Sequence, residues 1–266
     1  MSPVFLLLLV AIIALLFWAN FWLGAAAALT APYWLGPVVL RLKTRYPLRP
    51  QIEPYRPGVD PAPEWARLHL ATVAAAFTPL GFKVAGSFQI AKWAAHVRTV
   101  VVLLLQPETR VLALGMAVFT EGAVVAKQAS VIEIATRFAG DLALTTSNSD
   151  QINVFAPIPG RTCERFPALR DVPRLFRLHR ALMARLAPDG VTELTASGPV
   201  ELLLDGVTRE MSAQVAAGLM WIDGEHYRPT WRGAAVYAWK LLFPWKQLER
   251  ARLRRRAAAL GAELGE

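Results

Sequence analysis

Residues 97–119 read VRTVVVLLLQPETRVLALGMAVF, two apolar runs on either side of a short polar turn. The runs, Val97–Gln106 and Arg110–Phe119, are rich in Val and Leu and have the length of strands. Only the three residues 107–109 separate them. Because parallel strands need a much longer crossover, a connection this short predicts that the two strands are antiparallel neighbours.

Three more strand-like runs lie on either side of this pair, at Phe82–Trp93, Ser130–Phe138 and Leu142–Ser147. Along the run from Ser130, the side chains of Ile132 to Phe138 at even positions share one face, with polar residues on the other. Glu133 and Arg137 lie on that second face and are expected to form a surface pair. The pattern predicts an antiparallel meander of about five strands, backed by helices on one face only.

Helices are expected before and after the meander. Asp60 and Pro61 form a typical helix start, and that helix is expected to end near Phe77. Further helices are expected at Val172–Leu186 and Pro199–Gly218, followed by a C-terminal pair that is amphipathic and basic. A helix, a meander and then helices is the order of an α+β domain.

The first forty residues contain no charged side chain. Val4–Leu23 is long and apolar enough to cross a bilayer as a helix, which satisfies its own backbone hydrogen bonds. Trp22 and the pair Tyr33-Trp34 are aromatic residues of the kind that favour the membrane interface. Because two prolines and a glycine interrupt residues 24–40, we expect this stretch to be a kinked continuation or an interfacial segment.

Four cations, Arg41, Lys43, Arg45 and Arg49, follow the apolar stretch, and none precedes it. By the positive-inside rule, this asymmetry predicts a single-pass membrane protein with its N-terminus outside and its main domain cytoplasmic. A cleaved signal peptide is the alternative. The stretch lacks the basic start of a signal peptide, and its apolar core is too long for one.

The net charge of +9 is concentrated near two points of the chain, residues 41–49 and residues 229–266, while residues 50–228 are balanced. The C-terminal stretch combines aromatic and basic side chains, which suits a segment on anionic lipid. The alternative is a core helix with a solvated basic tail. The residues expected to contact the membrane are Trp22, Trp34, Arg41, Lys43, Arg45, Trp239, Phe243, Trp245, Lys246, Arg250, Arg254, Arg255 and Arg256.

These features divide the chain into four parts. Residues 1–40 are the transmembrane anchor with its interfacial segment, and residues 41–63 are a basic and then Pro-rich linker. Residues 64–228 are the α+β domain, and residues 229–266 are the aromatic-basic membrane-surface segment.

Two groups of residues are candidates for a site. His179 lies in the apolar arc of the helix Val172–Leu186, where it is either a general base or a core histidine. Arg170 and three further arginines form the opposite side of this helix, which is either solvated or binds an anion. The polar run 145–151 includes Thr146, Ser147 and Asn148, which either bind a polar ligand or form an ordinary loop.

No phosphate loop, nucleophile elbow, zinc motif or EF-hand is present, and Cys163 is the single cysteine. We therefore expect no metal and no cofactor. The sequence favours a non-enzymatic scaffold that contacts lipid or binds a partner, with anionic headgroups and a membrane protein as the expected partners.

Two other functions remain open. A membrane-tethered hydrolase acting on a lipid or envelope component would combine His179 with a hydroxyl of the polar run. A nucleic-acid tether would use the basic tail, and the expected hairpin Met220–Arg228 between two helices superficially resembles the wing of winged-helix proteins.

Overall fold

The computed structural model describes residues 3–94, 97–120, 127–151, 153–187 and 198–264. The chain divides into two compact units. The first contains residues 1–45, 152–156 and 211–248, and the second contains residues 46–151, 157–210 and 249–266. The hairpin near residue 224 therefore belongs to the same unit as the N-terminal helices, whereas the sequence grouped it with the α+β domain.

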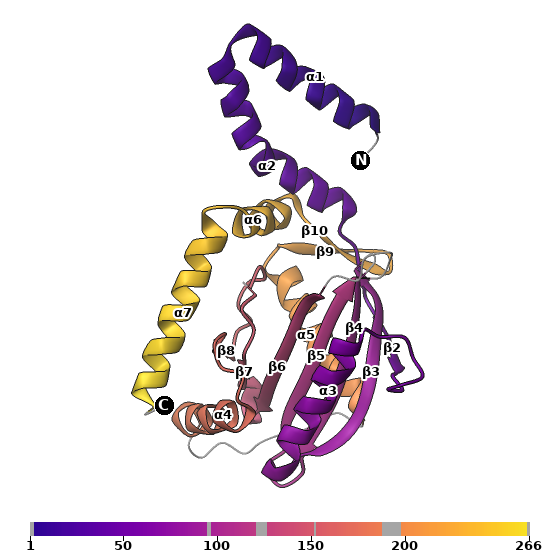
Figure 1. Cartoon of the computed structure of the whole chain (residues 1–266), viewed down its shortest axis with the longest axis vertical. Coiled ribbons are helices and arrows are strands. Elements are labelled where there is room, and N and C mark those ends of the chain that lie inside the picture. The colour runs from indigo at the N-terminus through magenta and orange to yellow at the C-terminus, as the bar shows by residue number, and fades with distance from the viewer. Residues whose placement is uncertain (1–2, 95–96, 121–126, 152, 188–197, 265–266) are drawn as a thin grey trace. The chain divides into compact units, whose positions relative to one another are not determined.

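A seven-stranded mixed sheet forms the centre of the second unit (Figure 1). Its strand order is β2-β3-β4-β5-β6-β7-β8, and every neighbouring pair is antiparallel except β7 and β8. The α+β class predicted from the sequence is confirmed. The strands are β2 (Gln51–Pro54), β3 (Lys83–Ala94), β4 (Val97–Gln106), β5 (Val111–Thr120), β6 (Lys127–Arg137), β7 (Ala143–Ser147) and β8 (Arg161–Arg165).

The two edge strands are absent from the sequence-based meander. β2 lies within the stretch expected to be a linker, and Gln89 of β3 donates a hydrogen bond to the Glu53 carboxylate at 3.0 Å. β8 contains Cys163 and runs parallel to β7. The parallel pairing is possible because residues 148–160 separate the two strands and supply a long crossover.

The larger core of this unit lies between the sheet and two helices, α3 (Glu64–Phe77) and α4 (Val172–Leu186). Val73 and Phe77 of α3 and Leu175 of α4 are buried against the sheet residues Val102 and Ile134. Both helices present apolar side chains at intervals of three and four residues, which places those side chains on one side of each helix.

The opposite face of the sheet is also covered, so the expectation of helices on one face only is wrong. Leu202 of α5 (Pro199–Ala216) packs against Leu103 and Leu112 in a second buried cluster, and Figure 1 shows α3 and α5 on opposite sides of the sheet. This cover explains why β4 is apolar at successive positions, since both of its faces exclude water.

Glu133 and Arg137 do not form the expected pair. Arg137 is paired with Asp205 of α5, and Glu133 lies 4.0 Å from Arg161 of β8. The sequence predicted that the face of the sheet carrying these two residues is exposed to water. In the structure, α5 supplies acidic side chains to this face.

Two helices, α1 (Pro3–Ala19) and α2 (Phe21–Lys43), begin the first unit, and α1 folds back against α2 (Figure 1). Asn20 causes the break, because its side-chain oxygen accepts hydrogen bonds from the backbone N–H of Trp22 at 3.0 Å and of Leu23 at 3.4 Å. Within the part of the chain that the structure describes, one helix, Phe21–Lys43, is long and apolar enough to cross a membrane, and the expected span Val4–Leu23 is interrupted.

The α2 helix continues through Pro32 and Pro37, within the stretch that the sequence predicted to be a kinked continuation or an interfacial segment. The same unit contains the hairpin of β9 (Met220–Asp223) and β10 (His226–Pro229), followed by α6 (Trp231–Leu241). Gly36 of α2 faces α6, and a Cβ atom built on it would lie 3.2 Å from the Cβ atom of Ala238. Small residues at this position let the two helix backbones approach closely.

Gly115 of β5 is a test of the main core, since an added Cβ atom would lie 2.9 Å from Cγ1 of both Val73 and Val102. We expect Gly115→Ala to lower the free energy of unfolding by about 1–3 kcal/mol, because overpacking forces neighbouring side chains out of their preferred positions. Gly206→Ala in α5 is the matched control, because an added Cβ there meets no atom within 4 Å. Urea unfolding followed by circular dichroism measures both, and equal destabilisation of the two variants would contradict the packing described here.

Candidate functional site

His179 of α4 is fully buried and lies between two threonine hydroxyls. Its Nε2 atom is 2.8 Å from Oγ1 of Thr136 on β6, and its Nδ1 atom is 2.9 Å from Oγ1 of Thr146 on β7. A neutral imidazole has one N–H donor and one acceptor nitrogen, so one threonine accepts from the ring and the other donates to it. Both ring nitrogens are thereby satisfied inside the core.

Burial lowers the pKa of His179 to about 3, so the ring is uncharged at neutral pH. A base of this strength holds a proton poorly, and His179 lines neither of the two cavities described below. His179 and Thr146 do lie within hydrogen-bond distance, as the hydrolase hypothesis requires. Their burial gives a substrate no access to them, so we assign this group a structural role.

The polar run 145–151 begins within β7, and its side chains enter three different environments. Thr146 points to His179, while Thr145 and Ser147 lie on the opposite face of the sheet and line a small cavity. Asn148 lies just beyond the strand and lines a larger cavity. Its Oδ1 atom accepts a hydrogen bond from the Ile132 N–H at 2.8 Å, which fixes the orientation of its amide group. The four catalytic candidates therefore do not converge on one site.

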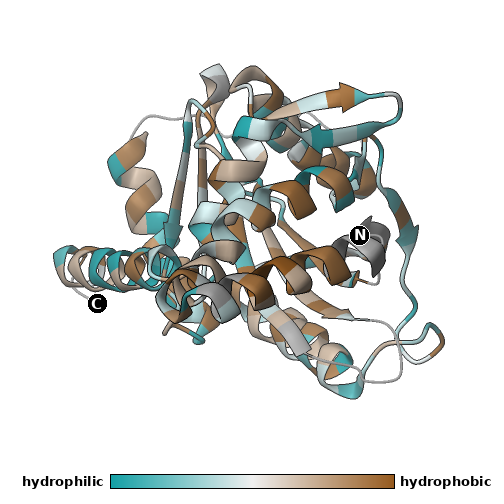
Figure 2. Ribbon diagram, turned by 90° about the horizontal axis from the view of Figure 1, so that it is seen from above, coloured by the Kyte–Doolittle hydropathy of each residue, from teal (hydrophilic) through white to brown (hydrophobic). Residues whose placement is uncertain are grey.

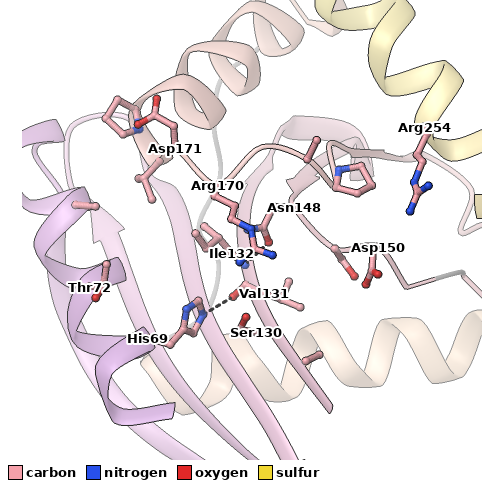
Figure 3. A pocket seen from close by; sticks show the side chains of 17 residues that line it. His69, Thr72, Ser130, Val131, Ile132, Asn148, Asp150, Arg170, Asp171 and Arg254 are labelled. Carbon is pink, nitrogen blue, oxygen red and sulfur yellow. Dashed lines mark hydrogen bonds between the residues drawn. The ribbon is translucent and has the colours of Figure 1, made fainter. Parts of the chain in front are cut away.

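The larger cavity has a volume of about 710 Å³ and lies within the second unit. Figure 3 shows His69 and Thr72 of α3 at one side, Arg254 at the other, and Arg170 and Asn148 between them. The first residues of α4 and the segment before it, the loop after β7 and residues 129–132 of β6 also line the cavity. The Nε2 atom of His69 lies 3.3 Å from the carbonyl oxygen of Val131, so the ring is held against the sheet.

The smaller cavity, of about 210 Å³, lies on the opposite face of the sheet and contains Glu133, Arg161 and Cys163. Arg161 is 2.8 Å from Glu210 of α5 and 4.0 Å from Glu133. Burial raises the pKa of both Glu133 and Glu210. The guanidinium between the two carboxyl groups offsets part of this effect, and the arrangement ties the sheet to α5.

The basic residues of the C-terminal helix α7 (Trp245–Glu263) have different surroundings. Arg256 binds both carboxylate oxygens of the buried Glu164, with Nε 2.9 Å from Oε2, and Arg250 lies 3.8 Å from Asp150. Arg254 lines the larger cavity, whereas Arg255 is exposed and Lys246 is half-buried. Two of the expected membrane-binding cations are thus paired with acids of the α+β unit.

The same helix also contributes apolar contacts to this unit. Ala257, Leu260 and the following Leu264 pack against the larger core, while Figure 2 shows many hydrophilic residues along the helix that ends at the C-terminus. The part of the tail after residue 248 is thus a layer of the α+β unit.

The aromatic candidates gather in the first unit. The ring of Trp239 lies 5.4 Å from that of Tyr33 on α2 and 5.4 Å from that of Trp245. Phe243 is 69% exposed, and Trp22 and Trp34 are exposed along α2. The α6 helix therefore brings Trp239 to α2, the helix that carries Trp22 and Trp34.

The cations at the end of α2 also lie in the first unit. The guanidinium of Arg41 lies 5.4 Å from the ring centre of Trp221 and 5.9 Å from that of Trp231. Lys43 and Arg45 are exposed. Such stacking on aromatic faces holds the Arg41 charge at the end of the apolar helix.

Sequence reasoning missed Thr136, Glu164 and the contribution of α3 to the larger cavity. A signal for Thr136 was present, since it is a polar residue at a buried position of an alternating strand. Glu164 lies on a strand that was not predicted, and its pairing with Arg256 joins residues far apart in the chain.

Among the residues that the structure describes, no three His, Cys, Asp or Glu side chains gather closely enough to hold a metal ion. Comparison of the chain with protein-family models, with curated proteins and with solved structures finds no match.

The pKa of His179 makes stability depend on pH. It is about 3 in the folded protein against 6.5 in an unfolded chain, so the unfolded state binds the proton first as the pH falls. We expect full stability above pH 6.5 and a loss of up to about 1.4 kcal/mol per pH unit from pH 6.5 down to about 3. Urea unfolding across this range should show a steeper loss for the wild type than for His179→Gln.

A direct measurement is the histidine NMR titration of the wild type. The His179 ring signals should stay unchanged between pH 8 and 5. A titration midpoint near 6.5 would contradict the buried, neutral ring.

Proposed function

We propose that the protein is a membrane-anchored, non-enzymatic module that contacts lipid through two elements of its first unit, the α1–α2 pair and α6. One observation carries the proposal: α6 packs against α2, with Trp239 on Tyr33 and with Phe243 exposed. Aromatic rings in this arrangement suit the region between the headgroups and the hydrocarbon. The C-terminal aromatic segment then lies at the same surface as the anchor.

The exposed surface of the two N-terminal helices supports an anchor. Leu7, Leu15 and Leu29 are between 67% and 77% exposed, and the sequence of α1 contains no polar side chain. Burial of such a side chain stabilises a protein by roughly 1.5–3 kcal/mol relative to exposure to water, and contact with lipid would provide this free energy. The 23 residues of α2 give a helix about 35 Å long, enough for the hydrocarbon core.

The break at Asn20 supports a helical hairpin in place of the single-pass arrangement with an external N-terminus. If α2 crosses the membrane and α1 folds back along it, both ends of the pair lie on one side. The cations Arg41, Lys43, Arg45 and Arg49 favour the cytoplasmic side for that end and for the α+β unit. The N-terminus is then cytoplasmic as well.

The rival functions have less support. The hydrolase hypothesis depends on His179 as a base, and this side chain is buried and has a lowered pKa. The nucleic-acid hypothesis depends on free cations in the tail, and Arg256 and Arg250 already face acidic side chains. The proposal also includes a second membrane protein as a binding partner of this module.

Spin labels test lipid contact at the end of α6, where Phe243 lies two residues after the last residue of the helix. In a Cys163→Ser background, we expect a label at Phe243→Cys in anionic vesicles to be more accessible to oxygen than to a water-soluble nickel reagent. A label at Ala259→Cys, on an exposed position of α7, is the control and should favour the nickel reagent. If both labels report water, α6 does not contact lipid and the proposal fails.

A further inference from the structure

Two arginine side chains that line the larger cavity have no ion-pair partner among the described residues. Among the described residues, neither Arg170 nor Arg254 forms an ion pair or a side-chain hydrogen bond. They come from different parts of the chain, the segment before α4 and the middle of α7. Figure 3 shows both beside the space between α3 and α7.

The acidic residues of the cavity are engaged in other contacts. The Asp171 carboxylate accepts a hydrogen bond from the Arg174 backbone N–H at 2.9 Å and so caps α4. Asp150 lies 3.8 Å from Arg250. Neither acid forms an ion pair with Arg170 or Arg254, so the N–H donors of the two guanidinium groups remain available to a ligand.

Neutral hydrogen-bond donors also line the cavity. Thr72 and Ser130 contribute hydroxyl groups. The carbonyl oxygen of Asn148 is used by Ile132, so the NH2 group of Asn148 is the part of its amide available to a ligand. Two guanidinium groups with hydroxyl and amide donors match the several acceptor oxygens of a phosphate group.

We propose that this cavity binds a phosphate group carried by a small organic molecule. The volume of about 710 Å³ is larger than a phosphate ion needs and lies within the usual range of small-molecule sites. The phosphate belongs either to a lipid headgroup or to a soluble phosphate ester, and both present the same oxygens to the arginines. This inference does not depend on the membrane contact of α6.

Calorimetric titration of the full chain in an uncharged detergent tests the site with two probes, inorganic phosphate and a short-chain phosphatidic acid. We expect Arg170→Gln and Arg254→Gln each to weaken binding about tenfold or more, the usual effect of losing one charge-assisted hydrogen bond. Arg255 follows Arg254 on α7 and does not line the cavity. Arg255→Gln is therefore the matched control and should bind the probes as tightly as the wild type does.

Asn148→Asp provides a second, nearly isosteric variant. It keeps the acceptor for the Ile132 N–H and replaces the NH2 group with negative charge, so phosphate binding should weaken while the melting temperature without ligand stays close to that of the wild type. This comparison separates loss of the ligand contact from loss of the fold.

The two probes identify the source of the phosphate. If phosphatidic acid binds more tightly than inorganic phosphate, and both arginine variants lose this binding, the ligand is a lipid headgroup. If inorganic phosphate binds as tightly as phosphatidic acid or more tightly, the ligand is soluble. The proposal is overturned if neither probe binds the wild type, or if the two cavity variants bind as tightly as Arg255→Gln. Either failure leaves the spin-label result for α6 unaffected, since the titration contains no bilayer.

Discussion

The architecture of the α+β unit depends on one constraint, the need to cover both apolar faces of its sheet. The α3 and α4 helices bury one face and α5 buries part of the other, so side chains that alternate along a strand enter different environments. This alternation sends Thr146 to His179 and sends Thr145 and Ser147 to the smaller cavity. The larger cavity lies between α3 and the beginning of α4. Residues 129–132 of β6 also line it.

The bidentate contact between Arg256 and Glu164 gives the basic tail its position in this unit. Glu164 is buried, so its charge would be costly without a partner, and the guanidinium supplies that partner. Once Arg256 is bound, the same helix places Arg254 at the cavity. The aromatic residues before residue 248 belong instead to the unit of α2. The C-terminal segment thus contributes to both units, with its residues up to 248 in the unit of α2 and its later residues in the α+β unit.

Much of this fold follows from local patterns in the sequence. The helix Val172–Leu186 has the predicted bounds, because its apolar spacing and the Asp171 cap are both local signals. The five central strands match the five apolar runs, since short turns leave few alternatives. The β8 strand and the Arg256–Glu164 pair were not predictable, because each depends on residues brought together by the tertiary fold. The sequence shows Asn20 as a polar residue in an apolar run, but no local pattern predicts that its side chain caps α2.

The proposed anchor is a hairpin of α1 and α2 that leaves the α+β unit in the cytoplasm. It is tested most directly by labelling single thiols, Ser2→Cys and Arg49→Cys in a Cys163→Ser background, with an impermeant maleimide. The account predicts that both react in inverted membrane vesicles and that neither reacts in right-side-out vesicles. Reaction of Ser2→Cys alone in right-side-out vesicles would contradict the hairpin and favour a single pass, and reaction of Arg49→Cys there would overturn the orientation.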